Sequence, residues 1–304
     1  MNTAVGAVDG TVAVRARGLG KRYRAKWALR ECTFDLPKGR VAALVGANGA
    51  GKTTLMSVLA GLLDADEGSA GAVGRVAFVP QEKPVYRHFT AAGMLRLGAR
   101  LNVVWDEERA RRWLARFDVP LDRPCGKLSG GGQAQVAFAL AIGSRPDVLM
   151  LDEPLANLDP LARREVTAEL LGEVAATGMT VLLSTHVVAE LSGVADHLLL
   201  LAHGRLLGGG DLDELLARHV GYTGPRSDVP PALGEVVQAR HSAGQSTFLV
   251  ELPEGQPRPV VAGPWVERPP TLEDYVLAQL EATREEAARK ETTRKETTRK
   301  GAGA

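Results

Sequence analysis

GANGAGKTT, residues Gly46–Thr54, is the stretch that decides the fold of this chain. Its glycines and its Lys-Thr pair fit the pattern G-x-x-x-x-G-K-[ST], whose backbone N–H groups surround phosphate oxygens. An apolar run, Val41–Val45, precedes it, and an apolar-periodic segment follows from Leu55 to Leu62. Strand, turn and helix in this order are the context that the pattern requires. We therefore predict an α/β fold built on a phosphate-binding loop.

The residue types in this loop suit the triphosphate of a nucleotide. Glycine lets the backbone curl closely around phosphate oxygens, and the helix that begins near Lys52 turns the positive end of its dipole to the same anion. Lys52 would reach the β- and γ-phosphates, and the Thr53 hydroxyl would ligate Mg²⁺. A plain glycine turn is the alternative, but it gives no reason for the Lys-Thr pair. The predicted nucleotide contacts are Gly46, Ala47, Asn48, Gly49, Ala50, Gly51, Lys52, Thr53 and Thr54.

The composition is that of an ordinary globular protein of about two domain lengths. Of the 304 residues, 45% are hydrophobic and 24% are charged, and the formal net charge is +1. Because a near-neutral chain has no overall field that draws it to nucleic acid, we expect no nucleic-acid partner. Cys32 and Cys125 have neither metal nor disulfide spacing, which indicates a reducing compartment. No apolar run approaches the roughly 20 residues that span a bilayer, so we expect any membrane role to need a partner.

Two stretches of alternating polarity, Thr11–Arg17 and Ala28–Leu36, predict strands on either side of a segment that holds Tyr23. Tyr23 could pack between these strands or stack on a nucleotide base, and the sequence alone leaves both open. Beyond the phosphate loop, the glycine-rich segment 63–74 predicts a turn-rich break.

Three more apolar strands are predicted, and each leads directly into a residue with chemical uses. They are 75–80 before Gln81, 147–151 before Asp152 and Glu153, and 179–184 before Thr185 and His186. Open parallel sheets bind ligands at the edge where the strands end, so these residues should meet near Gly46. Side chains alternate along a strand, so one of the two carboxylates can serve Mg²⁺ while the other polarises water. A lone histidine is more often a core residue and a lone glutamine a surface residue, but the shared edge favours a joint site.

Residues 90–118 change to helical periodicity, with an apolar stripe from Ala110 to Phe117. The arginines of this segment are explained by i, i+4 pairs, Glu107 with Arg111 and Glu108 with Arg112, on a solvated face. Further on, Ser129 precedes three glycines and an apolar helix. This is a capped helix N-terminus, which is able to hold a second anion.

The remaining elements are predicted from periodicity and turn residues. They are a helix at 161–176, a hairpin of 197–201 with 205–207, a helix from Asp211, a linker at 221–231, a hairpin of 235–241 with 246–252, and a helix from Thr271. The last helix should bury one face, made of Leu272, Val276, Leu277 and Leu280. The KETTR repeats at the end are expected to be a solvated tail without a function.

This pattern divides the chain into four parts. We expect a mobile N-terminus at 1–10, a nucleotide-binding domain at 11–219 with a helical insert at about 88–141, an accessory region at 220–284, and a helix end with low-complexity tail at 285–304.

The ordered motifs resemble the ATPase subunit of an ABC (ATP-binding cassette) transporter over about Val12–His219. The C-terminal hairpin and helix make the chain most similar to the ATPases of bacterial multicomponent exporters, which implies export. The resemblance implies an α/β phosphate-loop NTPase core with an antiparallel β subdomain and a helical insert, followed here by a small α+β extension. It implies ATP and Mg²⁺ as cofactors, adenine stacking for Tyr23, and a dimer-communication loop at Asn157–Pro160. It also implies catalytic roles for Lys52, Gln81, Glu153 and His186, metal roles for Thr53, Gln81 and Asp152, and signature-loop contacts to nucleotide from Ser129, Gly130 and Gly131.

In this family two ATPase subunits close head to tail on two ATP molecules, and a separate transmembrane permease subunit is driven by them. The resemblance therefore implies a second ATPase subunit, a permease partner, and a cytoplasmic position on the inner face of the cell membrane. Two departures stand out: Gly132 occupies the place of the usual signature glutamine, and the segment before Gln81 is short, which predicts a trimmed β subdomain. A soluble ABC protein that acts on ribosomes or DNA is the alternative, but such proteins usually show tandem cassettes or a coiled coil, and the sequence has no sustained heptads.

Overall fold

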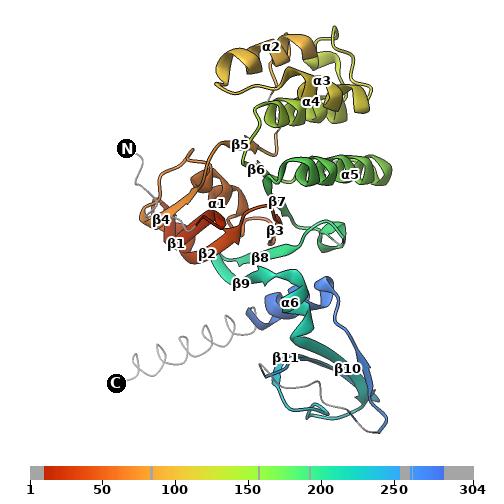
Figure 1. The fold of residues 1–304 in the computed structure, drawn as a ribbon. Coiled ribbons are helices and arrows are strands. Elements are labelled where there is room, and N and C mark those ends of the chain that lie inside the picture. Colours follow the sequence, from red (N-terminus) through yellow and green to blue (C-terminus); the bar gives the residue numbers. More distant parts are fainter. Residues whose placement is uncertain are drawn as a thin grey trace. The chain divides into compact units, whose positions relative to one another are not determined.

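The computed structural model describes residues 10–82, 85–156, 158–191, 193–253, 261 and 263–283. The chain divides into two compact units, Met1–Gly209 and Gly210–Ala304 (Figure 1). The boundary expected near His219 therefore lies inside the second unit. Because the KETTR repeats, Asn157 and the first nine residues fall outside the described residues, the expectations for them stay untested.

The core of the first unit is a six-stranded sheet of order β5-β6-β7-β3-β8-β9, whose first five strands run parallel to their neighbours. Its strands are β5 Val76–Val79, β6 Val148–Leu151, β7 Thr180–Thr185, β3 Val41–Val45, β8 His197–Ala202 and β9 Arg205–Asp211. Every residue of β3, β6, β7 and β8 is buried, which explains their continuous apolar runs. The strands expected before Gln81, Asp152 and His186 are confirmed.

A three-stranded antiparallel sheet of order β2-β1-β4 stands beside the core. Its strands are β1 Val12–Tyr23, β2 Lys26–Pro37 and β4 Glu67–Ala72. The expectation of a turn-rich break at 63–74 was wrong, because β4 lies within it and pairs with β1. A Cβ on Gly68 would lie 2.3 Å from the Arg17 carbonyl oxygen, so the pairing of the two strands requires glycine at this position. In the sequence the same glycine suggests a turn, which is why the composition was misleading. Pairing partners override the weak strand propensity of this segment.

The helical insert consists of α2, α3, the short η1 and α4, and Figure 1 shows the three α-helices side by side. Their bounds are α2 Ala91–Leu101, α3 Glu107–Arg116, η1 Cys125–Lys127 and α4 Gly130–Gly143. Trp113 of α3 is buried against Phe138 of α4, with ring centroids 5.6 Å apart. The Trp113 indole N–H donates to the Gln135 side-chain oxygen at 2.9 Å, which satisfies its polar atom inside the core. The pairs Glu107–Arg111 and Glu108–Arg112 are confirmed, at 2.6 and 3.5 Å.

Three more helical segments complete the first unit: α1 Lys52–Leu59, α5 Pro160–Thr177 and the single turn η2 Val188–Leu191. The α5 helix begins at Asp159, whose side chain accepts hydrogen bonds from the backbone N–H groups of Leu161 and Ala162. Glu173 of α5 forms an ion pair with Arg109 of α3 at 2.5 Å, and both side chains are almost fully buried. Within the described part of the chain, no helix combines the length and the apolar character that crossing a bilayer requires.

The second unit holds a four-stranded sheet of order β11-β12-β10-β13, the helix α6 and a helix at 272–283. Its elements are α6 Leu212–Ala217, β10 His219–Pro225, β11 Glu235–His241, β12 Gln245–Glu251 and β13 Val266–Arg268. The linker expected at 221–231 was wrong in its first half, because β10 lies between two strands and buries Tyr222. Leu277 was also misplaced, since 40% of it is exposed while Leu272 and Val276 are buried as expected.

Candidate functional site

The phosphate loop joins β3 to α1 and is fixed by close backbone approaches. A Cβ on Gly46 would lie 2.3 Å from the Leu201 carbonyl oxygen, and one on Gly51 would lie 2.6 Å from that of Ala28. Gly51 also has a φ of +109°, which L side chains rarely adopt. Any larger residue at Gly46 or Gly51 would clash with these carbonyl oxygens, so the loop conformation requires glycine at both positions.

Lys52 begins α1 and is 6% exposed. Its ammonium donates to the Gly46 carbonyl oxygen at 2.9 Å and to that of Ala47 at 3.5 Å. It also lies 3.5 Å from a carboxylate oxygen of Glu153. A buried ammonium with these partners is a concentrated positive charge inside the loop, where an anion would be held.

Thr53 meets the end of β6 at the next position of α1. Its hydroxyl donates to the Asp152 carboxylate at 2.7 Å, and Ser184 of β7 donates to the other carboxylate oxygen. The described residues hold no cluster of three or more His, Cys, Asp or Glu side chains that could bind a metal alone. One carboxylate with one hydroxyl suits Mg²⁺, which prefers oxygen ligands and completes its shell with phosphates and water.

Glu153 gathers the other predicted catalytic residues around its side chain. One carboxylate oxygen lies 3.5 Å from Lys52 Nζ and 3.2 Å from His186 Nδ1, and the other accepts from Gln81 Nε2 at 3.2 Å. The backbone of Glu153 is left-handed, with φ +45°, and its N–H donates to Ser184 Oγ at 2.9 Å. Such a conformation in a non-glycine residue is uncommon and is typical of functional sites.

A cleft of about 670 Å³ opens over Lys52, Gln81 and Glu153, whereas Asp152 and His186 are not among its walls. Its walls are Tyr23, Lys26, Trp27, Ala28, Asn48, Gly49, Gly51, Lys52, Thr53, Thr54, Gln81, Glu153, His203 and Gly204. Tyr23 is 49% exposed, so it is not packed between the strands and its ring is accessible from the cleft. Trp27 and His203 were missed, although the β1–β2 hairpin that pairs Tyr23 with Lys26 also carries Trp27. No sequence signal points to His203, which reaches the cleft from the turn between β8 and β9.

The helix N-terminus at Ser129 is capped as predicted, but it does not line this cleft. Ser129 caps α4, because its hydroxyl accepts from the Gly132 N–H at 3.1 Å. Neither Ser129 nor the glycines Gly130 and Gly131 are among the described walls of the cleft over Lys52. Within the described residues of one chain, the Ser129 turn therefore contributes nothing to the cleft over Lys52.

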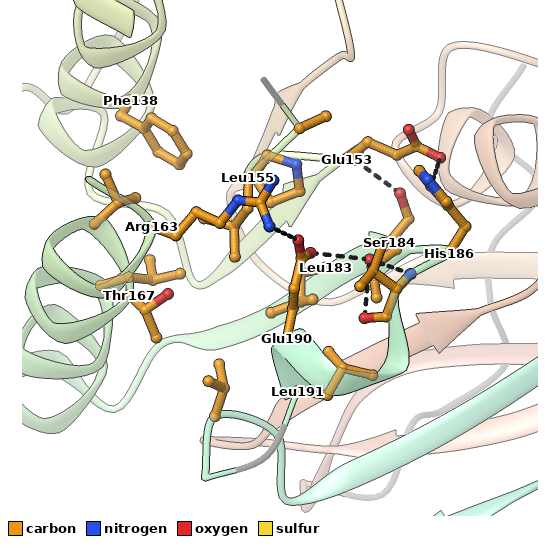
Figure 2. Close-up of a pocket in the computed structure, with 17 residues that line it drawn as sticks. Phe138, Glu153, Leu155, Arg163, Thr167, Leu183, Ser184, His186, Glu190 and Leu191 are labelled. Carbon is orange, nitrogen blue, oxygen red and sulfur yellow. Dashed lines mark hydrogen bonds and ion pairs between the residues drawn. The ribbon is translucent and has the colours of Figure 1, made fainter. Parts of the chain in front are cut away.

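A smaller cavity of about 200 Å³ is lined in part by Glu153 and His186 (Figure 2). Apolar side chains from α4, α5, β7 and η2 make most of its wall, among them Phe138, Leu170 and Leu191.

Ser184 was also missed in the sequence analysis, although it lies on the strand next to Asp152 and hydrogen-bonds both the Asp152 carboxylate and the Glu153 backbone N–H. Only the pairing of β6 with β7 brings it there.

Comparisons with known proteins agree with this geometry. The family model described as "ABC transporter" matches residues 29–156. The Nod factor export ATP-binding protein I of Sinorhizobium fredii (strain NGR234) is 31% identical, over 88% of this chain and 85% of that protein. The aliphatic sulfonates import ATP-binding protein SsuB of Corynebacterium glutamicum is 38% identical, over 64% of this chain and 82% of that protein.

A solved structure, titled as the ATP binding subunit of an ABC transporter, superposes with a TM-score of 0.62 at 27% identity. It covers 67% of this chain, and 92% of its own length is matched. ATP-hydrolysing cassettes of this kind bind ATP with Mg²⁺, which fits the Lys52 loop and the Thr53–Asp152 oxygen pair. The chain belongs to the family of ATP-binding subunits of ABC transporters.

Proposed function

We propose that this chain hydrolyses ATP between two copies of its cassette and thereby drives export through a separate membrane permease. The observation that carries the catalytic part is the contact set of Glu153, which joins Lys52, His186 and Gln81 beside the Thr53–Asp152 pair. A carboxylate base that contacts one cation and two hydrogen-bonding side chains suits phosphoryl transfer to water.

Each side chain has a task in this proposal. Lys52 and the backbone N–H groups of the loop stabilise the negative charge that develops on the phosphoryl oxygens. Thr53 and Asp152, with Gln81 near by, would hold Mg²⁺, which would supply positive charge to neutralise the phosphates. Glu153 accepts a proton from the attacking water, and His186 holds the Glu153 carboxylate and the terminal phosphate in place.

A second ATPase subunit is supported by the separation of the two anion sites. The Ser129 turn, with Gly130 and Gly131, lies outside the described walls of the cleft over Lys52. In a lone chain the Ser129 turn does not reach the cleft over Lys52, so it cannot contact a phosphate bound there. We propose that the Ser129 turn of one copy closes the Lys52 cleft of another. The cleft then closes when ATP binds and opens after hydrolysis, and Tyr23 at the cleft wall stacks on adenine.

Export is favoured over import by how far the relatives match. The first unit holds 209 of the 304 residues, which is about 69% of the chain. The import relatives SsuB and ModC cover 64% and 70% of the chain, whereas the Nod factor export relative covers 88% and so extends well into the second unit. We propose that the second unit belongs to an export system, and that the assembled chain works at the cytoplasmic face of the membrane on its permease partner.

The test is purification of the tagged full chain from membranes of its own organism, followed by deletion of its gene. Co-purification of a hydrophobic permease, together with hypersensitivity of the deletion strain to toxic compounds, is expected. Ribosomal proteins in place of a permease, or a nutrient requirement in place of hypersensitivity, would contradict transport coupling or export respectively.

A further inference from the structure

An ion pair bridges α5 and η2 at the small cavity that Glu153 and His186 line in part (Figure 2). Arg163 of α5 contacts a carboxylate oxygen of Glu190 at 2.5 Å. The Arg163 Nε also donates to the Leu158 carbonyl oxygen at 2.9 Å. One guanidinium therefore joins the loop before α5 to the turn that follows His186.

The Glu190 carboxylate divides its contacts between two elements. While one oxygen faces Arg163, the other accepts from the Thr185 hydroxyl at 3.3 Å. The same hydroxyl accepts from the backbone N–H of Val187 at 3.0 Å. These contacts surround His186 in the chain, because they fix the residue before it and the residue after it.

The position of His186 depends on these neighbours more than on packing of its own ring. The His186 side chain is 45% exposed, and its ring nitrogen lies 3.2 Å from Glu153. Apolar packing beneath the segment is incomplete, since a cavity of about 200 Å³ remains there. Glu190, with 15% of its side chain exposed, is a partly desolvated charge that needs its partner.

We propose that Arg163 and Glu190 are positioning residues, which hold the His186 segment in register with Glu153 and anchor it to the loop before α5. The inference rests on the proposed role of His186 in ATP hydrolysis. Neither Arg163 nor Glu190 lines the nucleotide cleft, so their effect acts through His186. Losing this Arg163–Glu190 clamp should slow turnover and leave nucleotide binding intact, because misplacement of one catalytic group weakens the chemical step.

The test measures kcat and KM for ATP with Mg²⁺ and the Kd of ATP in Arg163→Met, Glu190→Gln and the double variant. We expect each single change to lower kcat about tenfold, with KM and Kd within about twofold. Since both changes break one contact, the double variant should lose no more than either single one. Arg163→Lys should have a kcat about threefold higher than Arg163→Met, because lysine restores the positive charge but lacks the second N–H donor that reaches the Leu158 carbonyl. The exposed neighbour Arg164→Met is the matched control and should keep the parental kcat.

Hydrogen exchange of the backbone gives a readout that is independent of turnover. In Arg163→Met the Val187 and Glu190 N–H groups, which bond Thr185 Oγ1 and the Val187 carbonyl, should exchange about tenfold faster than in the parent. A kcat within twofold of the parent, additive losses in the double variant, or unchanged exchange would each overturn the clamp. A parent chain that hydrolyses no ATP would instead contradict the proposed function, and the exchange measurement would still decide on the clamp.

Discussion

Glu153→Gln removes one negative charge from the site and keeps the size and shape of the side chain. Glu153 lies 3.5 Å from Lys52 Nζ, and their side chains are 11% and 6% exposed. At an effective dielectric constant of about 20, this attraction is about 5 kcal/mol before desolvation is subtracted. Losing one partner of such a buried pair costs about 3 kcal/mol, because the other charge stays buried alone.

The expected consequence is a split between stability, binding and turnover. Without nucleotide the Tm of Glu153→Gln should fall by about 6–12 °C, since about 1 kcal/mol corresponds to 2–4 °C in a domain of this size. ATP returns an anion to Lys52, so the rise in Tm on adding ATP with Mg²⁺ should be larger in the variant than in the parent. Turnover should fall by about 10²–10⁴, because the water loses its base.

The assay combines phosphate release, ATP titration and thermal unfolding on the purified full chain. Glu108→Gln is the control, because that carboxylate pairs with Arg112 at 3.5 Å on the surface and is 89% exposed. It should leave turnover unchanged. Turnover of Glu153→Gln within tenfold of the parent, or an ATP Kd weakened more than tenfold, would refute the assignment of Glu153 as the base.

Three further predictions follow from single contacts. Lys52→Ala should weaken ATP binding by about 2–3 kcal/mol, or roughly 30–150-fold, since it removes a charge-assisted contact to phosphate; a titration with Kd unchanged would contradict this. Tyr23→Ala should raise the ATP Kd by about 1–2 kcal/mol while Tyr23→Phe leaves it unchanged, because the proposed contact uses the ring face; equal losses in both variants would argue against stacking. In the second unit, hydrogen bonding from Arg268 lowers the pKa of Asp274 to about 2, so the stabilisation is complete above the unfolded-state value near 4 and is lost progressively as pH falls through about 2. After discounting for its partial exposure, we expect Asp274→Asn to cost about 1 kcal/mol in urea unfolding at pH 7 and clearly less near pH 2; an equal loss at both pH values would contradict the pair.

The sequence could predict that the candidate site residues lie close together, because most of them follow directly after strands. Gln81, Asp152 and His186 each follow an apolar strand, and parallel pairing brings those ends together beside the phosphate loop. Ser184 was not readable in the same way, because its hydrogen bonds to Asp152 and Glu153 depend on which strand neighbours β6. Local apolar patterns identify a buried strand, but they do not show which other strand pairs with it.

The two elements that were predicted wrongly share one physical cause. Their glycine-rich composition is typical of loops, but hydrogen bonding to neighbouring strands holds them as strands. Gly68 makes 63–74 look like a turn, yet it is required for close pairing of β4 with β1. Gly221, Gly224 and Pro225 make β10 look like a linker, yet β12 and β13 pair on either side of it. The Trp265 ring explains the second glycine, because a Cβ on Gly224 would lie 2.4 Å from it.

The central claim is that one chain supplies the phosphate loop and the catalytic carboxylates, while a second chain supplies the Ser129 turn. A crystal structure of Glu153→Gln with ATP and Mg²⁺ tests this most directly. We predict two chains with an ATP molecule in each interface, the phosphates on Lys52 of one copy and on the Ser129 turn of the other. A nucleotide bound away from the Gly46 loop, or far from His186 and the Ser129 turn of a second copy, would contradict the account.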